Sequence, residues 1–88
     1  MSNATITSIE LRLAWLKDHY STWENNLKSG STDPTYAVSC TAKMLEAEAE
    51  MNGILYVVSM LGYHVRYSED KIGHTVCELY TVCELYEG

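Results

Sequence analysis

Apolar residues recur at alternating spacings of three and four in the first third of the chain, which is the pattern of one buried stripe along an α-helix. The stripe consists of Ile6, Ile9, Leu13, Leu16, Tyr20, Trp23 and Leu27. Thr7 and Glu10 have the spacing of a capping box, in which each side chain satisfies a backbone N–H of the first turn, and Gly30 is a typical C-terminal cap. We therefore predict a helix over about residues 8–29.

A second stripe with the same spacing follows a short polar connection. Asp33 and Pro34 favour a helix start, because an aspartate caps the first turn and a proline at the first position loses no hydrogen bond. The stripe consists of Ala37, Cys40, Met44, Ala47, Met51, Ile54, Val58 and Leu61. The dipeptide Asn52-Gly53 is a turn signal, and a break there would make the next residues a strand. Because the spacing passes through Gly53 unchanged, we predict one helix over about 34–61.

The two stripes match when the second helix folds back antiparallel on the first. Large residues then meet small ones at three layers, Leu27 on Ala37, Trp23 on Cys40 and Leu16 on Ala47. The same register places Arg12 beside Glu50. It also places Lys17 beside Glu48, so opposite charges flank the apolar stripe as they do in coiled coils. The pattern predicts a helical hairpin.

Residues 63–86 are rich in threonine, valine and tyrosine, with turn residues at 68–71, which is typical of a β-hairpin or strand ribbon. The hexamer Thr-Val-Cys-Glu-Leu-Tyr occurs twice, at 75–80 and 81–86. Six is a multiple of the strand period of two, so both copies keep the same inward face. The second copy is unpaired, swapped into a neighbour or without a role. We predict one α+β domain over 1–88, with the β segment packed on the open end of the hairpin.

Residues 54–61 are apolar nearly all round, and a helix that is apolar on every side is buried on every side. The remaining chain or another subunit must therefore cover the open end. Trp15, Tyr56, Tyr63 and Tyr67 are expected to gather there. Tyrosine and tryptophan dominate protein interfaces, so these four residues form a candidate contact surface.

The chain of 88 residues carries 12 acidic and six basic residues, a formal net charge of −6. This charge repels nucleic-acid phosphates and anionic membrane surfaces, so we expect no direct binding to nucleic acid or membrane. Glu46, Glu48 and Glu50, together with Glu24 and Asp18, form a candidate acidic face that mimics nucleic-acid phosphates toward a basic partner protein. The alternative is an ordinary solvated helix face.

Chemical function finds little support in the residues. His64, His74, Cys77 and Cys83 are the best candidate zinc ligands, but a strand would place His74 and Cys77 on opposite faces and the two cysteines about 20 Å apart. The chain shows no glycine-rich phosphate loop and no nucleophile–base–acid set. We therefore expect no metal, no cofactor and no enzymatic activity.

The three cysteines are an odd count, which argues against a disulfide framework. The first residues lack the basic and apolar segments of a signal peptide, and no stretch approaches the about 20 apolar residues that cross a bilayer. These features predict a cytoplasmic protein with reduced thiols.

The leading hypothesis is a small acidic protein-binding module without catalytic activity. In this class we expect an anti-CRISPR-like inhibitor from a phage or mobile element, directed at a basic nucleic-acid-handling enzyme such as a defence nuclease. The alternative is a self-assembling structural protein, a homodimer or larger, in which the apolar open end and the repeated strand join identical chains. A small metal protein or enzyme is the third hypothesis.

Overall fold

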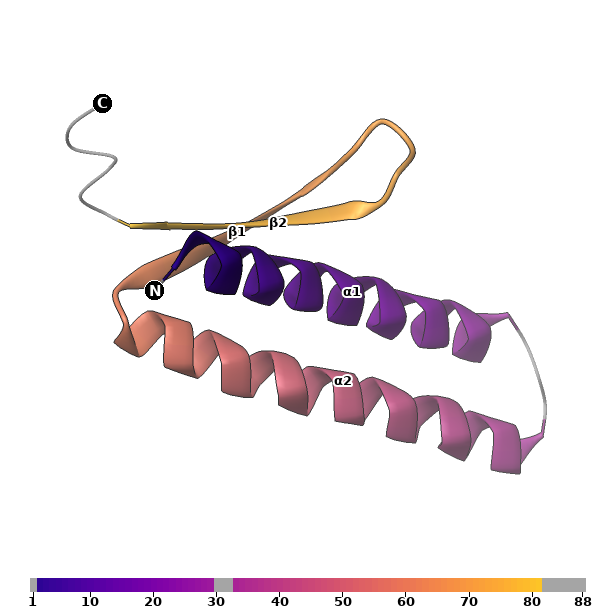
Figure 1. Cartoon of the computed structure of the whole chain (residues 1–88). Helices are drawn as coiled ribbons and strands as arrows, with labels where there is room; N and C mark the ends of the chain where they lie inside the picture. The colour runs from indigo at the N-terminus through magenta and orange to yellow at the C-terminus, as the bar shows by residue number, and fades with distance from the viewer. Residues whose placement is uncertain (1, 30–32, 82–88) are drawn as a thin grey trace.

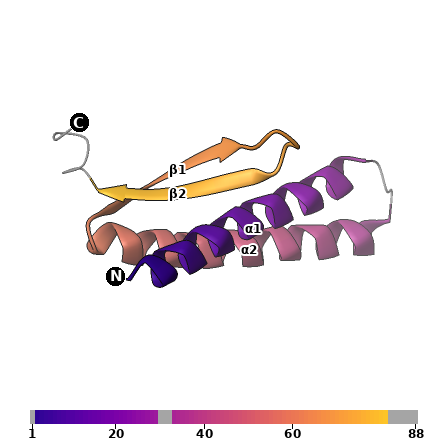
Figure 2. The same ribbon diagram turned by 45° about the horizontal axis from the view of Figure 1, so that its top comes forward.

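The computed structural model of the chain describes residues 2–29 and 33–81, and it contains two helices followed by a two-stranded sheet (Figure 1). The elements are α1 (Asn3–Lys28), α2 (Pro34–Met60), β1 (Tyr63–Glu69) and β2 (Thr75–Thr81). The helices run antiparallel, and the sheet lies on α1 and on the open end of the hairpin (Figures 1 and 2). The predicted α+β class, a helical hairpin with a β-hairpin packed on it, is confirmed.

The first helix begins before the predicted position 8. Ser2 caps it, because its hydroxyl accepts the backbone N–H of Thr5 at 3.2 Å. The predicted capping box of Thr7 and Glu10 is therefore wrong. The Glu10 carboxylate lies in the third turn and accepts the backbone N–H of Leu79 in β2, at 2.8 Å.

The second helix is continuous through Gly53, as predicted. Asp33 caps it by accepting the backbone N–H of Thr35 at 2.9 Å, and Pro34 occupies the first turn. After the helix, Gly62 adopts a φ of 89°, a conformation that only glycine adopts readily, and this turns the chain into β1.

The predicted register of the hairpin is confirmed by an ion pair between the helices. The Arg12 guanidinium donates two hydrogen bonds to the Glu50 carboxylate, one of them from Nη2 to Oε1 at 2.8 Å. The second expected edge pair is wrong, because Lys17 does not turn toward Glu48. The sheet lies on that side of α1, and the Lys17 ammonium is 4.2 Å from the centroid of the Tyr67 ring in β1, as in a cation–π contact.

The two strands pair antiparallel with Tyr63 opposite Thr81 and Glu69 opposite Thr75. The turn lies later than predicted, because the Asp70 carboxylate accepts the backbone N–H groups of Ile72 and His74 and so closes the loop after Glu69. Of the second hexamer copy, residues 82–86 lie outside the described residues.

The core forms where the sheet covers the open end of the hairpin. Leu13 of α1, Val58 of α2, and Cys77 and Leu79 of β2 are buried together. The inward residues of β1, including Tyr63 and Tyr67, pack around this cluster. The chain itself therefore covers the inner side of the open end, one of the two predicted possibilities.

Two carboxylates of α1 hold the outer edge of β2. Asp18 accepts the Thr75 hydroxyl at 2.5 Å and its backbone N–H at 3.4 Å, and Glu10 accepts the backbone N–H of Leu79. Eight residues of helix span about 12 Å and four residues of strand about 13 Å, so the two contacts match in spacing. The two carboxylates accept hydrogen bonds from backbone N–H groups on the outer edge of β2, which pair with no neighbouring strand among the described residues.

Candidate functional site: the outer face of α2

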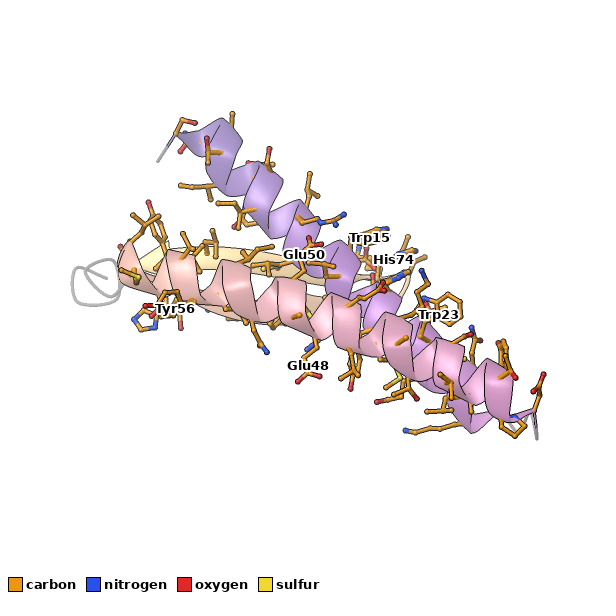
Figure 3. The ribbon with its side chains drawn as sticks, turned by 90° about the horizontal axis from the view of Figure 1, so that it is seen from below. Trp15, Trp23, Glu48, Glu50, Tyr56 and His74 are labelled. Atoms are coloured by element: carbon orange, nitrogen blue, oxygen red, sulfur yellow. The ribbon has the colours of Figure 1, made fainter. Side chains whose placement is uncertain are left out.

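The side of α2 that points away from α1 and the sheet carries no charged residue. Positions spaced four, three and four residues apart lie in one line along an α-helix, since each residue turns by about 100°. On α2 the line consists of Val38, Ala42, Leu45, Ala49, Gly53, Tyr56 and Met60, which we call the outer face. Its large side chains are exposed, with 60% of Leu45 and 72% of Met60 open to solvent. Figure 3 looks onto this side of the molecule, and Tyr56 marks the face there.

The opposite side of the same helix is the core side. Cys40, Ala47 and Val58 lie there and are almost completely buried. A helix on the surface of a globular protein is normally polar on its outward side. Because α2 is apolar on both sides, its outer face has the character of a protein-contact surface.

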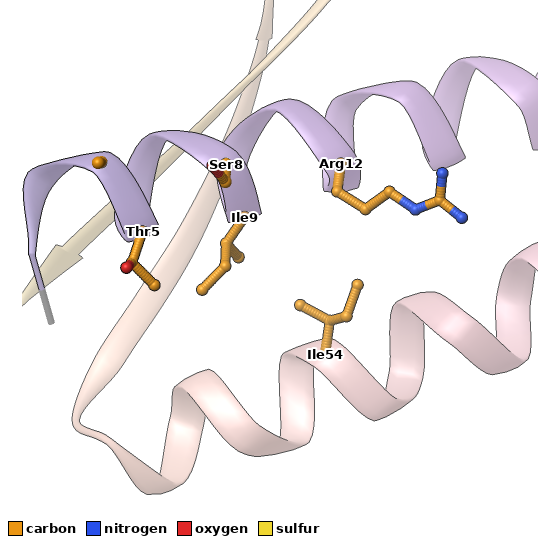
Figure 4. Close-up of a pocket in the computed structure, with 6 residues that line it drawn as sticks. Thr5, Ser8, Ile9, Arg12 and Ile54 are labelled. Carbon is orange, nitrogen blue, oxygen red and sulfur yellow. The ribbon is translucent and has the colours of Figure 1, made fainter.

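An apolar groove adjoins the outer face where the helices diverge. Ile9 of α1 and Ile54 of α2 point toward each other across this space (Figure 4). A groove of about 470 Å³ is lined by these two isoleucines together with Ala49, Gly53 and Val57 of α2. Because Ala49 and Gly53 belong to both features, the apolar surface continues from the outer face into the groove.

The three predicted acidic residues of α2 lie on both sides of the outer face. Glu50 points toward α1 and Glu48 points to the opposite flank (Figure 3). The hydrogen bonds from Arg12 hold the pKa of Glu50 below its usual value, and the same bonds raise the pKa of Arg12. Glu46 has a cation of its own, the Lys43 ammonium at 3.9 Å. The three glutamates therefore flank an apolar stripe and do not form one acidic surface.

Trp15 belongs to a row of stacked side chains on α1. The Arg12 guanidinium lies 4.7 Å from the centroid of the Trp15 ring, and the His19 ring stacks on the Trp15 ring with the centroids 4.6 Å apart. His19 in turn accepts the indole N–H of Trp23 at 3.1 Å. Trp15 is 50% exposed, and its ring contacts Arg12 and His19.

The three predicted tyrosines are separated by the fold. Tyr56 is 67% exposed on the outer face. Tyr63 and Tyr67 point inward from β1 and pack on the core, where burial raises the pKa of Tyr67. Sequence reasoning missed Val38 and Leu45, although the second apolar spacing of α2 is visible in the sequence.

The described residues offer little chemistry. Cys40 is fully buried, and burial together with the charge of Glu10 raises the pKa of Cys77 to about 11, so its thiol stays protonated at neutral pH. Within 2–29 and 33–81, no three His, Cys, Asp or Glu side chains converge as metal ligands would. His64 stacks on Tyr80 in the sheet, and Cys83 lies outside the described residues.

Neither helix in the described part of the chain combines the length and the apolar character that crossing a membrane requires.

No protein-family model matches the chain, and no curated protein or solved structure matches it. The outer face of α2 is therefore the basis of the functional argument.

Proposed function

We propose that the chain is a non-catalytic protein-binding module that acts through the outer face of α2. The observation that carries this proposal is the uncharged, exposed stripe from Val38 to Met60. Twenty-two residues of helix are about 33 Å long, so the stripe runs along most of α2. Exposing such a stripe to water is unfavourable unless a partner covers it.

The spacing of the stripe favours a helical partner. Residues three and four apart on one helix form the ridge that packs into the groove of another helix. Helix-binding surfaces use this geometry, with apolar anchors at every turn. Ala42, Ala49 and Gly53 leave room between the larger anchors, so a partner helix can approach closely.

The charges give a finer hypothesis about the partner. The net charge of −6 and the exposed Glu48 at the edge of the stripe favour a partner with lysines or arginines around an apolar surface. A basic nucleic-acid-handling enzyme inhibited by this chain is such a partner. The buried thiols of Cys40 and Cys77 are free, which fits a reducing compartment such as the cytoplasm.

Site-specific cross-linking in the native host tests the proposal. A photoreactive amino acid at Leu45 places the probe in the outer face, and the same probe at Ile72, which is 80% exposed in the β-turn, is the matched control. We expect illumination to link position 45 to a protein that mass spectrometry identifies, and position 72 to give much less product. Equal yields at the two positions would contradict the proposal.

A further inference from the structure

We infer that the outer face of α2 binds the outer face of a second copy of this chain, antiparallel, about a two-fold axis at Ala49. This inference rests on the proposed function, and it names a second copy of the chain as the partner in place of the basic enzyme. In Figure 1, no helix or strand of residues 2–29 and 33–81 lies on the side of α2 away from α1, so a second helix has access to that side.

The spacing of the outer face is symmetric about Ala49. Val38 and Met60 are each eleven residues from Ala49. Ala42 and Tyr56 are each seven residues away, and Leu45 and Gly53 are each four residues away. In an antiparallel pair related by a two-fold axis, residues equidistant from the axis meet, so every position of the face has a partner in the second copy.

Two of the four kinds of pair combine a large residue with a small one. Tyr56 of one copy faces Ala42 of the other, and Leu45 faces Gly53. At the axis, Ala49 faces itself. Large side chains thus enter the space above small ones, as interdigitated packing requires. Because Gly53 lines the groove with Val57, the partner's Leu45 enters the groove.

Gly53 supplies a further argument. A glycine in the middle of a helix is unfavourable compared with alanine. A methyl group added at Gly53 would meet nothing within 4 Å among the described residues of its own chain. Packing among these residues therefore gives no reason for the glycine, whereas the partner's Leu45 needs the space.

The charges beside the stripe are balanced on one flank of this pair and repulsive on the other. In an antiparallel pair each flank of α2 meets the same flank of the partner. One flank brings Glu46 with Lys43 and Glu50 with Arg12, so acids and cations balance. On the other flank, Glu48 lies one residue from the axis and meets its counterpart. This repulsion predicts that neutralising Glu48 strengthens the dimer.

The size of the face sets the expected affinity. A stripe about 33 Å long and about 10 Å wide covers a few hundred Å² in projection, which is smaller than the about 800 Å² per partner of a standard interface. We therefore expect a dimer whose fraction rises with concentration. The dimer retains the monomer fold, because the outer face contributes nothing to the core.

Light scattering behind size exclusion is the first test, on the purified full chain over a hundredfold range of concentration. We expect the mass to rise from 9.9 kDa toward twice that value. Leu45→Glu should remain a monomer, and Ile72→Glu should behave as the wild type. Glu48→Gln should lower the dissociation constant severalfold. A wild-type monomer throughout, or an unchanged Leu45→Glu dimer, would overturn the inference.

Disulfide cross-linking tests the register in a Cys83→Ser background, where Cys40 and Cys77 are buried. Ala49→Cys should form a disulfide-linked dimer on mild oxidation, because Cα atoms that meet at the axis of packed helices lie about 4–6 Å apart, the range a disulfide spans. Ala42→Cys is the matched control, since its counterpart lies about 21 Å away along the helix. Equal cross-linking of the two variants would exclude this register.

A size exchange tests the packing. Gly53→Leu should weaken the dimer at least tenfold, because two leucines then compete for one space. Adding Leu45→Ala should restore dimerisation, since the small residue now faces the large one. Failure of the double variant to restore it would overturn the inference. If the chain is monomeric while the Leu45 probe links to another protein, the inference fails and the proposed function stands; if that probe also links nothing, both fail.

Discussion

The two faces of α2 have the same kind of apolar spacing and different surroundings. The inner face, with Ala47 and Val58, is buried against α1 and the sheet, whereas Leu45 and Tyr56 on the outer face are exposed. The difference teaches that apolar spacing predicts which side of a helix avoids water. It does not predict what covers that side, because the cover comes from elsewhere in the chain or from another molecule.

The sharpest test of this comparison replaces one leucine by alanine at each face of α2. Leu13 is fully buried opposite the inner face, and Leu45 is 60% exposed on the outer face. Leu13→Ala should lower the free energy of unfolding by about 2–5 kcal/mol, since it removes buried methyl groups and leaves a cavity. Leu45→Ala should change it by less than about 0.5 kcal/mol in dilute, monomeric protein. Urea denaturation measures both, and similar losses would mean that the two faces are not distinct.

The next largest loss of stability is expected where α1 holds the sheet that covers the inner face of α2. The Glu10 carboxylate accepts the backbone N–H of Leu79 at 2.8 Å and is partly buried. Glu10→Ala should cost about 1.5–3 kcal/mol, because hydrogen bonds to charged groups contribute about that much. Glu24, which lies 3.4 Å from Lys28 on the surface of α1, is the control, and Glu24→Ala should have a much smaller effect.

Amide hydrogen exchange gives a second readout for Glu10→Ala. The Leu79 amide should exchange faster in the variant. Burial and the Glu10 charge together raise the pKa of Cys77 to about 11, so loss of this charge should also lower that pKa. Unchanged exchange at Leu79 would mean that the carboxylate does not hold the edge of β2.

Glu10 also shows what sequence reasoning did not reach. Thr7 and Glu10 have the local spacing of a capping box, but the partner of Glu10 lies 69 residues away in β2. Such a contact depends on the assembled fold and leaves no local signal. The helical hairpin was predictable because its register is repeated over many layers, as the Arg12–Glu50 ion pair confirms.

The candidate surface was predictable only in part. Tyr63 and Tyr67 were assigned to it as aromatic residues, although strand alternation places both on the face that packs on the core. Tyr56 does lie on an exposed apolar surface. Val38 and Leu45 belong to a second apolar stripe of α2, and the sequence does not show that this stripe is the exposed one.

A smaller effect is expected at Gly53, where a substitution should increase the stability of the monomer. Gly53→Ala should stabilise the monomer by about 1 kcal/mol, because alanine is a better helix former and the added methyl group meets no described residue within 4 Å. Thermal denaturation at low concentration measures this gain. Ala49→Gly, on the same face, should produce a loss of similar size. A destabilised Gly53→Ala monomer would show that the outer face is packed within one chain.

The smallest effect is expected at the ion pair between Arg12 of α1 and Glu50, which lies on the flank of α2 between its inner and outer faces. Arg12 lowers the pKa of Glu50 below 4.5 in the folded chain, so the folded state binds fewer protons there than the unfolded state. The stabilisation is present above pH 4.5 and is lost as the pH falls through the folded-state pKa. In Arg12→Ala this part of the pH dependence should disappear. Both groups are exposed, so added salt should also weaken the ion pair and its pH dependence in the wild type. An acid transition that neither salt nor Arg12→Ala alters would mean that the ion pair contributes nothing, and that apolar contacts alone set the register of the inner face.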